Sequence, residues 1–161
     1  MPTLRFTERD LEAEQREKLE NKKARANAEL FAELLTPYLA EHFSYKRNHV
    51  TLGLGPMVNA RTAKYDLYLR VTPPRGPWGG GDSLVIARIE FKPARKGHGR
   101  RFMAFLVECA DRIGYSKIGI ESTNEESEAF GAKFGLVRYG DGKNLLGTVQ
   151  EIKTRLAEQS A

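Results

Sequence analysis

Hydrophobic residues are sparse in the first part of the chain, where the pattern is otherwise helical. Residues 7–43 are rich in Glu, Lys, Arg and Ala, with Thr7 in the position of an N-cap and Asp10 where a capping box places its acid. Apolar side chains become frequent only after about residue 26. We therefore predict a polar helix over about 7–26 and a second helical half that docks on the core, with Pro37 kinking or splitting the helix.

Strand patterns follow in the centre of the chain. Residues 49–54 and 63–71 alternate between apolar and polar positions, which predicts half-buried strands. Residues 83–91 are more continuously apolar, which predicts a central strand. The short stretch 3–6 is a candidate first strand.

Helices and strands alternate in the remainder of the chain. Apolar positions recur at helical spacing from about residue 100 to Gly114, and residues 116–122 form a strand pattern. Residues 124–135 predict a short helix, and "LVRY" and "GTVQEIKT" predict two closing strands. The predicted order is β-α-α-β-β-β-α-β-α-β-β, an α/β fold with a mixed sheet in one domain over residues 1–161.

The composition is globular, with 40% hydrophobic and 29% charged residues in 161. The longest apolar run, "FMAFLV", is far shorter than the roughly 18 residues of a membrane span, and the first residues lack the apolar core of a signal peptide. The single cysteine, Cys109, excludes an intrachain disulfide, and it lacks metal-ligand spacing to the three histidines. We expect a cytoplasmic protein with no metal site and no membrane contact.

Two side chains have competing interpretations. Trp78 lies in the Pro- and Gly-rich loop before residue 83, where it either covers an edge of the core or forms a flap over a substrate site. Cys109 lies on the apolar stripe of a predicted helix, which favours a packed small hydrophobe over a nucleophile.

Positive charge is concentrated in the middle of the chain. Residues 44–101 carry 12 Lys and Arg against 3 Asp and Glu, a net +9, whereas residues 1–43 and 102–161 each carry 7 against 9, a net −2. The block is either a solvated surface or the binding region for an anionic cofactor or substrate.

The segment "PARKGHGRRF" has the features of a phosphate-binding loop. It follows the predicted central strand, which ends at about Lys92, and a helix begins within residues 97–100. A helix start presents free backbone N–H groups and partial positive charge, and glycines allow a ligand close to that backbone. The segment is neither a Walker loop, which needs Gly-Lys-Ser/Thr, nor a dinucleotide fingerprint, which needs a third glycine where Phe102 stands.

This loop and the order of elements resemble the GCN5-related N-acetyltransferase (GNAT) superfamily. Gly97 and Gly99 match the small positions of its motif Gln/Arg-x-x-Gly-x-Gly/Ala, while Ala94 stands at the Gln/Arg position with Arg95 next to it. The segment "NEESEAFGAKFGL" resembles the second family motif, and the matching residues are Asn124, Ser127, Phe130, Lys133 and Gly135, with Leu136 where Phe is usual. The resemblance is specific over about residues 83–137.

The resemblance implies an acetyl-CoA site between the strands 83–91 and 117–122. It assigns backbone contacts with the pantetheine arm and the thioester to Ile89 and Phe91. It assigns the pyrophosphate to the loop residues Arg95, Lys96, Gly97, His98, Gly99 and Arg100, with Arg95 or Arg100 reaching the 3′-phosphate. The second motif adds Asn124, Ser127 and Phe130 to the cofactor site.

The resemblance also implies acid–base chemistry on an amine. Glu90 is the candidate general base, and the alternative is that it points outward or pairs with a nearby Lys or Arg. Gly131 occupies the position where the family often has a Tyr that protonates the leaving thiolate. Tyr139 or Tyr115 would have to replace that Tyr, or the thiolate leaves without help.

Two classes of function follow from these observations. The first is an N-acetyltransferase that moves the acetyl group of acetyl-CoA to a primary amine of an unidentified acceptor. The second is a GNAT-fold binding protein, with nucleic acid or another acidic molecule as partner, in which transfer is weak or lost, as Gly131 and Ala94 suggest. In both, the polar N-terminal helix is available to a partner or to a homodimer.

Overall fold

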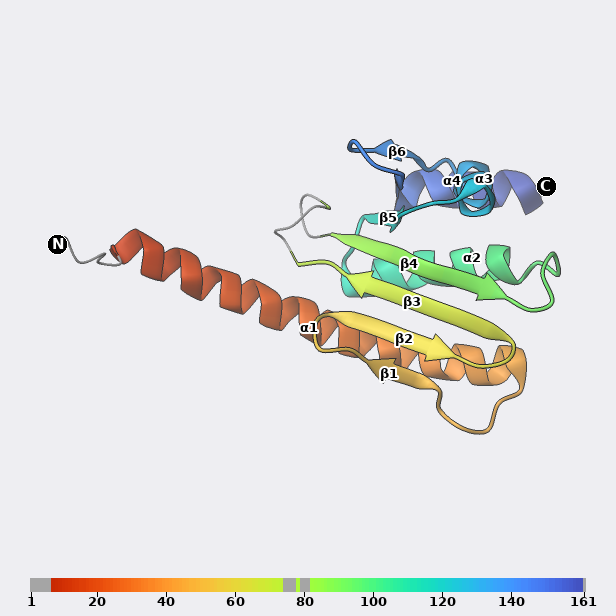
Figure 1. Cartoon of the computed structure of the whole chain (residues 1–161), viewed down its shortest axis with the longest axis horizontal. Helices are drawn as coiled ribbons and strands as arrows, with labels where there is room; N and C mark the ends of the chain where they lie inside the picture. The colour runs from red at the N-terminus through yellow and green to blue at the C-terminus, as the bar shows by residue number, and fades with distance from the viewer. Residues whose placement is uncertain (1–6, 74–77, 79–81, 161) are drawn as a thin grey trace.

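The structure is a computed structural model that describes residues 7–73, 78 and 82–160, and the candidate strand at residues 3–6 lies outside this part. The predicted α/β class with a mixed sheet is confirmed (Figure 1). The described elements, in chain order, are α1 (Glu8–Phe43), β1 (Val50–Leu52), β2 (Met57–Arg61), β3 (Tyr65–Val71), β4 (Ser83–Phe91), α2 (His98–Ile113), β5 (Lys117–Ile120), α3 (Glu125–Lys133), β6 (Val137–Tyr139), β7 (Asn144–Thr148) and α4 (Val149–Ser160).

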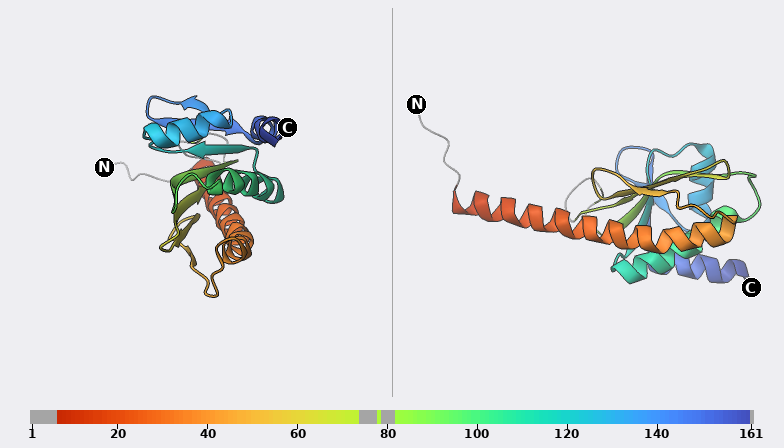
Figure 2. Two further views of the ribbon diagram at one scale, coloured as in Figure 1. Left: turned by 90° about the vertical axis from the view of Figure 1, so that its right-hand side faces the viewer. Right: turned by 90° about the horizontal axis from the view of Figure 1, so that it is seen from below.

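The described strands form one sheet in the order β1-β2-β3-β4-β5-β7-β6. Neighbouring strands are antiparallel except β4 and β5, which are parallel. The inward side chains of β3 are buried in strict alternation, as its sequence pattern predicts. Helices α1, α2 and α4 lie on one side of the sheet (Figure 2), so the core forms between them and that face.

Helix α1 is continuous, and the prediction that Pro37 splits it is wrong. Its predicted capping box is present: the Thr7 side chain accepts from the Asp10 amide, and the Asp10 carboxylate accepts from the Thr7 amide. The helix contacts the core only through its second part, where the buried residues are Ala24, Ala28, Phe31, Leu35, Leu39 and Phe43. The part before Ala24 projects away from the body (Figure 1), as the sparse apolar pattern predicted.

Three other elements differ from the predicted order. Strand β2 was not predicted, so four strands rather than three precede α2 in the described chain. The segment "GTVQEIKT" is not a strand, because β7 ends at Thr148 and α4 begins at Val149. Helix α4 is thus an additional helix, and it packs against α2 and β7.

Trp78 and Cys109 are both buried. The indole of Trp78 stacks on Tyr139, with ring centroids 5.5 Å apart, and lies so close to Gly119 that a Cβ there would come within 2.6 Å of it. Trp78 therefore covers the sheet at β5. Burial raises the pKa of the Cys109 thiol to about 12, so the thiol is a packing group rather than a nucleophile.

Candidate functional site

A cleft of about 1130 Å³ opens where β4 and β5 separate. The two strands pair from Ser83–Lys117 to Ile86–Ile120, and the Glu121 amide makes the last bond, 3.0 Å long, to the Ile86 carbonyl. Strand β4 continues to Phe91 beyond this point. The cleft is lined by β4, the loop to α2, the start of α2, and α3. All of the predicted site residues except Lys96 line it: Ile89, Glu90, Phe91, Arg95, Gly97, His98, Gly99, Arg100, Asn124, Ser127 and Phe130.

The first turn of α2 presents backbone N–H groups at the cleft. Gly97 is the N-cap residue, so no side chain accepts a hydrogen bond from the first amides of the helix, and the first turn contains no acidic residue. Free amides and partial positive charge are the features that bind a phosphate group. Gly97 has φ +78° and nothing within 4 Å of where its Cβ would be, so the backbone conformation requires glycine there and space is left beside it.

Gly99 is small for a different reason from the one that the sequence suggested. A Cβ at Gly99 would come within 2.9 Å of the Phe130 ring. The glycine therefore allows α2 and α3 to approach one another, and the Phe130 ring is fixed against it. Close helix packing, rather than ligand approach, determines this position.

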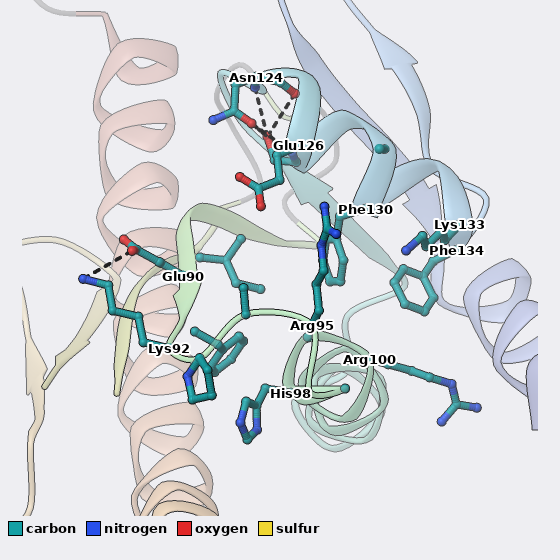
Figure 3. Close-up of a pocket in the computed structure, with 18 of the residues that line it drawn as sticks. Glu90, Lys92, Arg95, His98, Arg100, Asn124, Glu126, Phe130, Lys133 and Phe134 are labelled. Carbon is teal, nitrogen blue, oxygen red and sulfur yellow. Dashed lines mark hydrogen bonds and ion pairs between the residues drawn. The ribbon is translucent and has the colours of Figure 1, made fainter. Parts of the chain in front are cut away.

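The cations of the loop point in different directions. Arg95, in the left-handed backbone region with φ 61°, extends into the cleft beside Glu126 and Phe130 (Figure 3). Arg100 extends away toward α4, where it donates to the Leu156 carbonyl at 3.1 Å and to Gln159 Oε1 at 3.3 Å. Of these two guanidinium groups, Arg95 is therefore the one available to a phosphate in the cleft.

His98 is held at the α2 start by residues of α1. Its Nδ1 lies 3.0 Å from His42 Nε2, and its ring packs against both Phe43 and Phe91. The pKa of His42 is lowered, first by burial and then by the neighbouring His98 and Arg101. The two imidazoles thus share one hydrogen bond at the edge of the cleft, and one ring accepts from the other.

The α3 side of the cleft begins with a complete capping box. Asn124 Oδ1 accepts from the Ser127 amide at 2.9 Å, and Ser127 Oγ accepts from the Asn124 amide at 2.9 Å. Both polar side chains are therefore committed to the helix start. Phe130 supplies the apolar wall and packs edge-on against Phe134 at 5.1 Å.

Glu90 lies on β4 at the rim of the cleft. Its carboxylate is about half exposed and lies 3.5 Å from Lys92 Nζ (Figure 3). The alternative interpretation of Glu90, pairing with a nearby lysine, is thus observed, and the same exposure keeps the carboxylate within reach of a ligand in the cleft. Ile89 and Phe91 also line the cleft, and their partly buried side chains pack against the core.

No tyrosine of the described residues replaces the hydroxyl missing at Gly131. A Cβ at Gly131 would come within 2.7 Å of Leu145, so the position has no room for a side chain. Tyr115 is buried and donates to the Thr72 carbonyl at 2.7 Å, and burial raises its pKa. Tyr139 stacks on Trp78 and is not among the residues that line the cleft.

Several lining residues were not predicted as site residues, namely Lys92, Pro93, Ala94, Glu125, Glu126, Ala129, Lys133, Phe134 and Gln159. Lys133 was matched to the family motif and given no role. Gln159 reaches the cleft from α4, donating to the Lys133 carbonyl at 3.0 Å. It was missed because the segment "GTVQEIKT" was predicted as a strand, so that α4 was not recognised.

The described residues contain no group of three His, Cys, Asp or Glu side chains that could hold a metal ion. They likewise include no helix that is long and apolar enough to cross a membrane.

Searches by sequence find neither a matching family model nor a matching curated protein. Searches by structure find weakly similar chains. A CoA-dependent acyl-homoserine lactone synthase, MesI, is 14% identical with a TM-score of 0.41, covering 84% of this chain and 91% of that one. A chain of the KacTA–DNA complex is 15% identical with a TM-score of 0.42, and the match covers 78% of this chain and 86% of that one. A chain of AtaTR bound with AcCoA is 14% identical with a TM-score of 0.42, and the match covers 61% of this chain and 68% of that one.

These similarities are low, so the fold is best judged from the molecule itself. The antiparallel strands β1 to β4, the parallel β4–β5 pair that separates into a cleft, and the strand–loop–helix at that cleft agree with the motif resemblance over residues 83–137. The described chain has an α/β fold with one mixed sheet, and its resemblance to the GNAT superfamily rests on the sequence motifs of residues 83–137.

Proposed function

We propose that this protein transfers the acetyl group of acetyl-CoA to a primary amine. The observation that carries the proposal is the cleft, which combines the unpaired edge of β4, the side-chain-free start of α2 and the Arg95 guanidinium in one open channel. An extended thiol ester with a pyrophosphate at one end fits such a channel. The comparisons contribute nothing to the choice of acceptor, which stays unidentified.

The residues of the chain divide the binding between them. The amides of residues 98–100 and the Arg95 side chain would hold the pyrophosphate through charge-assisted hydrogen bonds. Beyond Ile86, the backbone groups of Ile89 and Phe91 on the edge toward β5 would bond the pantetheine arm as a neighbouring strand does. The Phe130 ring would close the apolar side of the channel.

Acetyl-CoA supplies an acetyl group activated as a thioester. The acceptor nitrogen forms the new bond to the carbonyl carbon, and the carbon–sulfur bond breaks. Glu90 would take the amine proton, directly or through a water molecule, because its carboxylate lies at the rim of the channel. Lys92 would have to release Glu90 partly for this purpose. Gly131 provides no acid for the departing thiolate, which would leave as the anion.

Calorimetry with acetyl-CoA, followed by thiol release with a panel of amines, tests the proposal. The buried Cys109 thiol gives little background in a thiol assay. Glu90→Gln should lower turnover by roughly 10²-fold with cofactor affinity retained. Glu126→Gln, which removes another carboxylate from the cleft lining, is the matched control and should retain turnover. Full activity of Glu90→Gln would remove Glu90 from the mechanism.

The second candidate is a binding protein that holds an acidic partner, and the buried Gly131 together with the +9 block favours it. Much of that block is already engaged. Arg70 pairs with both Glu121 oxygens, Arg61 lies 3.7 Å from Asp66, and Lys64 donates to the Phe43 carbonyl.

Retention on DNA or tRNA with saturating CoA, in wild type and in Arg61→Glu/Lys64→Glu, separates the candidates. Salt-sensitive retention that the double variant loses, together with cofactor binding but no thiol release, would favour the binding protein. Thiol release with no retention would favour the enzyme.

A further inference from the structure

Helix α1 has a second apolar stripe that the body does not cover. The exposed leucines Leu11, Leu19 and Leu30 are 48%, 68% and 37% accessible. At about 100° per residue, these positions fall within an arc of about 100° on the side of the helix opposite the buried stripe. The first two belong to the projecting part of α1 (Figure 1). Single exposed leucines are common on protein surfaces, so the charges that accompany these leucines decide whether the face forms a contact.

The charges on this face are separated by sign along the helix. Glu8 and Glu12 stand near its N-terminus, and Lys18 and Lys22 stand two to three turns later. By the same helical spacing all four lie within or beside the arc of Leu11 and Leu19, and all four are exposed. Gln15 is at the centre of the set. Along the helix the face is therefore acidic before Gln15 and basic after it, with one leucine in each half.

We propose that the projecting part of α1 pairs antiparallel with the same segment of a second copy of the chain. With Gln15 on the two-fold axis, Leu11 of each copy packs against Leu19 of the other. The same register places Glu8 opposite Lys22 and Glu12 opposite Lys18, twice over. A two-fold contact of this kind is self-complementary. A parallel pair would instead place Glu8 beside Glu8 and Lys18 beside Lys18, so the charges select the antiparallel orientation.

The length of the projection fits this register. The helix begins at Glu8, seven residues before Gln15, and the first buried residue is Ala24, nine residues after it. At about 1.5 Å per residue the two distances are about 10 and 14 Å. The start of one helix therefore reaches to just short of the body of the other copy. The stripe also faces away from its own body, so the two bodies lie at opposite ends of the pair without collision.

The energies involved predict a weak dimer. Exposed ion pairs contribute a few tenths of a kcal/mol each, and Lys18 also lies 3.7 Å from Glu14 of its own helix. Two buried leucine pairs add more. A polar helical projection of about four turns is marginal by itself in water, so pairing also stabilises the helix. We expect dissociation in the micromolar range, with weakening at high salt.

Sedimentation across a concentration series, with charge reversals, tests the proposal. Glu8→Lys/Glu12→Lys makes the face wholly basic, and Lys18→Glu/Lys22→Glu makes it wholly acidic. Each variant alone should dissociate at least tenfold more readily than wild type, and an equimolar mixture of the two should form a heterodimer. A wild type that stays monomeric at several hundred micromolar overturns the proposal. So does a dimer that both variants preserve.

A cross-link tests the register independently of affinity. Gln15→Cys should form an intermolecular disulfide under mild oxidation, because the axis brings the two copies of that residue together. Glu17→Cys lies on the opposite side of the helix and should stay largely reduced. The native Cys109 is buried and does not compete. Equal cross-linking of the two variants would overturn the proposed register.

Discussion

Two helices begin at the same cleft, and their first turns are built in opposite ways. Helix α2 starts from Gly97 with no side-chain cap and no acid in its first turn, whereas α3 starts from the Asn124–Ser127 capping box and carries three acids in its first turn. The Asn124 and Ser127 amides at the start of α3 thus donate within the capping box, and the first turn carries negative charge, while the first turn of α2 lines the cleft without either. Helix dipole alone does not make an anion site, because the residues at the start decide whether the amides are available.

The largest expected effect comes from a carboxylate at the α2 start. Gly97→Glu should weaken acetyl-CoA binding by about a hundredfold or more, because an anion would stand where the pyrophosphate binds. Gly97→Ala carries the same backbone strain at φ +78° without the charge and is the control. Calorimetry on both variants separates charge from strain. Equal affinities for the two would place the pyrophosphate elsewhere.

The two arginines should separate binding from stability. Arg95→Ala should weaken acetyl-CoA binding about tenfold, since one charge-assisted hydrogen bond is lost. Arg100→Ala should instead lower the melting temperature, because Arg100 ties α2 to Leu156 and Gln159. Calorimetry and thermal melts of both proteins measure the two quantities. An Arg100→Ala protein that melts normally and binds poorly would reverse the two roles.

Loss of the α3 capping box should lower the stability of the protein and leave cofactor binding nearly unchanged. Asn124→Ala should lower the free energy of unfolding by about 1 kcal/mol, which corresponds to about 2–4 °C in melting temperature for a domain of this size. Cofactor affinity should change less than twofold. A large loss of affinity with normal stability would show that Asn124 contacts the ligand itself.

The smallest expected effect is on the pH dependence of stability, and it involves His42, which contacts His98 at the start of α2. The folded pKa of His42 lies below its unfolded value, so the unfolded chain binds the proton more readily. Stability should therefore fall as pH drops through about 6.5. His42→Gln should flatten the decrease in melting temperature between neutral and acidic buffer. His49→Gln, outside the cleft, is the control, and an unchanged profile in His42→Gln would assign the pH dependence to other groups.

The sequence predicted the cleft better than it predicted the edges of the fold. The strand, loop and helix at residues 83–114 were recognisable because their periodicities differ and two glycines separate them. Helix α4 was missed because the window "GTVQEIKT" joins the end of β7 to the start of a helix, although Val149, Ile152 and Leu156 have helical spacing. Strand β2 was missed because five residues after a proline give too short a pattern.

Tertiary contacts decided the remaining differences. Pro37 does not split α1, because Leu35 and Leu39 on either side of it are both buried in the core and hold the helix together. Gly99 was predicted as a residue of the cofactor loop. That a side chain at this position would meet the Phe130 ring could not be known from one sequence. The direction of Arg100 likewise depends on α4. Positions follow from local pattern, while the direction of long side chains follows from packing.

The single tryptophan of the chain makes one of these packing arrangements visible to fluorescence. Trp78 is buried against Gly119 and Tyr139, so its emission reports the integrity of the β5–β7–β6 end of the sheet. The projecting part of α1 contains no aromatic residue and is seen only by circular dichroism at the helical band. A helical signal that decreases before the tryptophan emission shifts would mean that the projection frays while the sheet stays folded, so the molecule would carry two separate transitions.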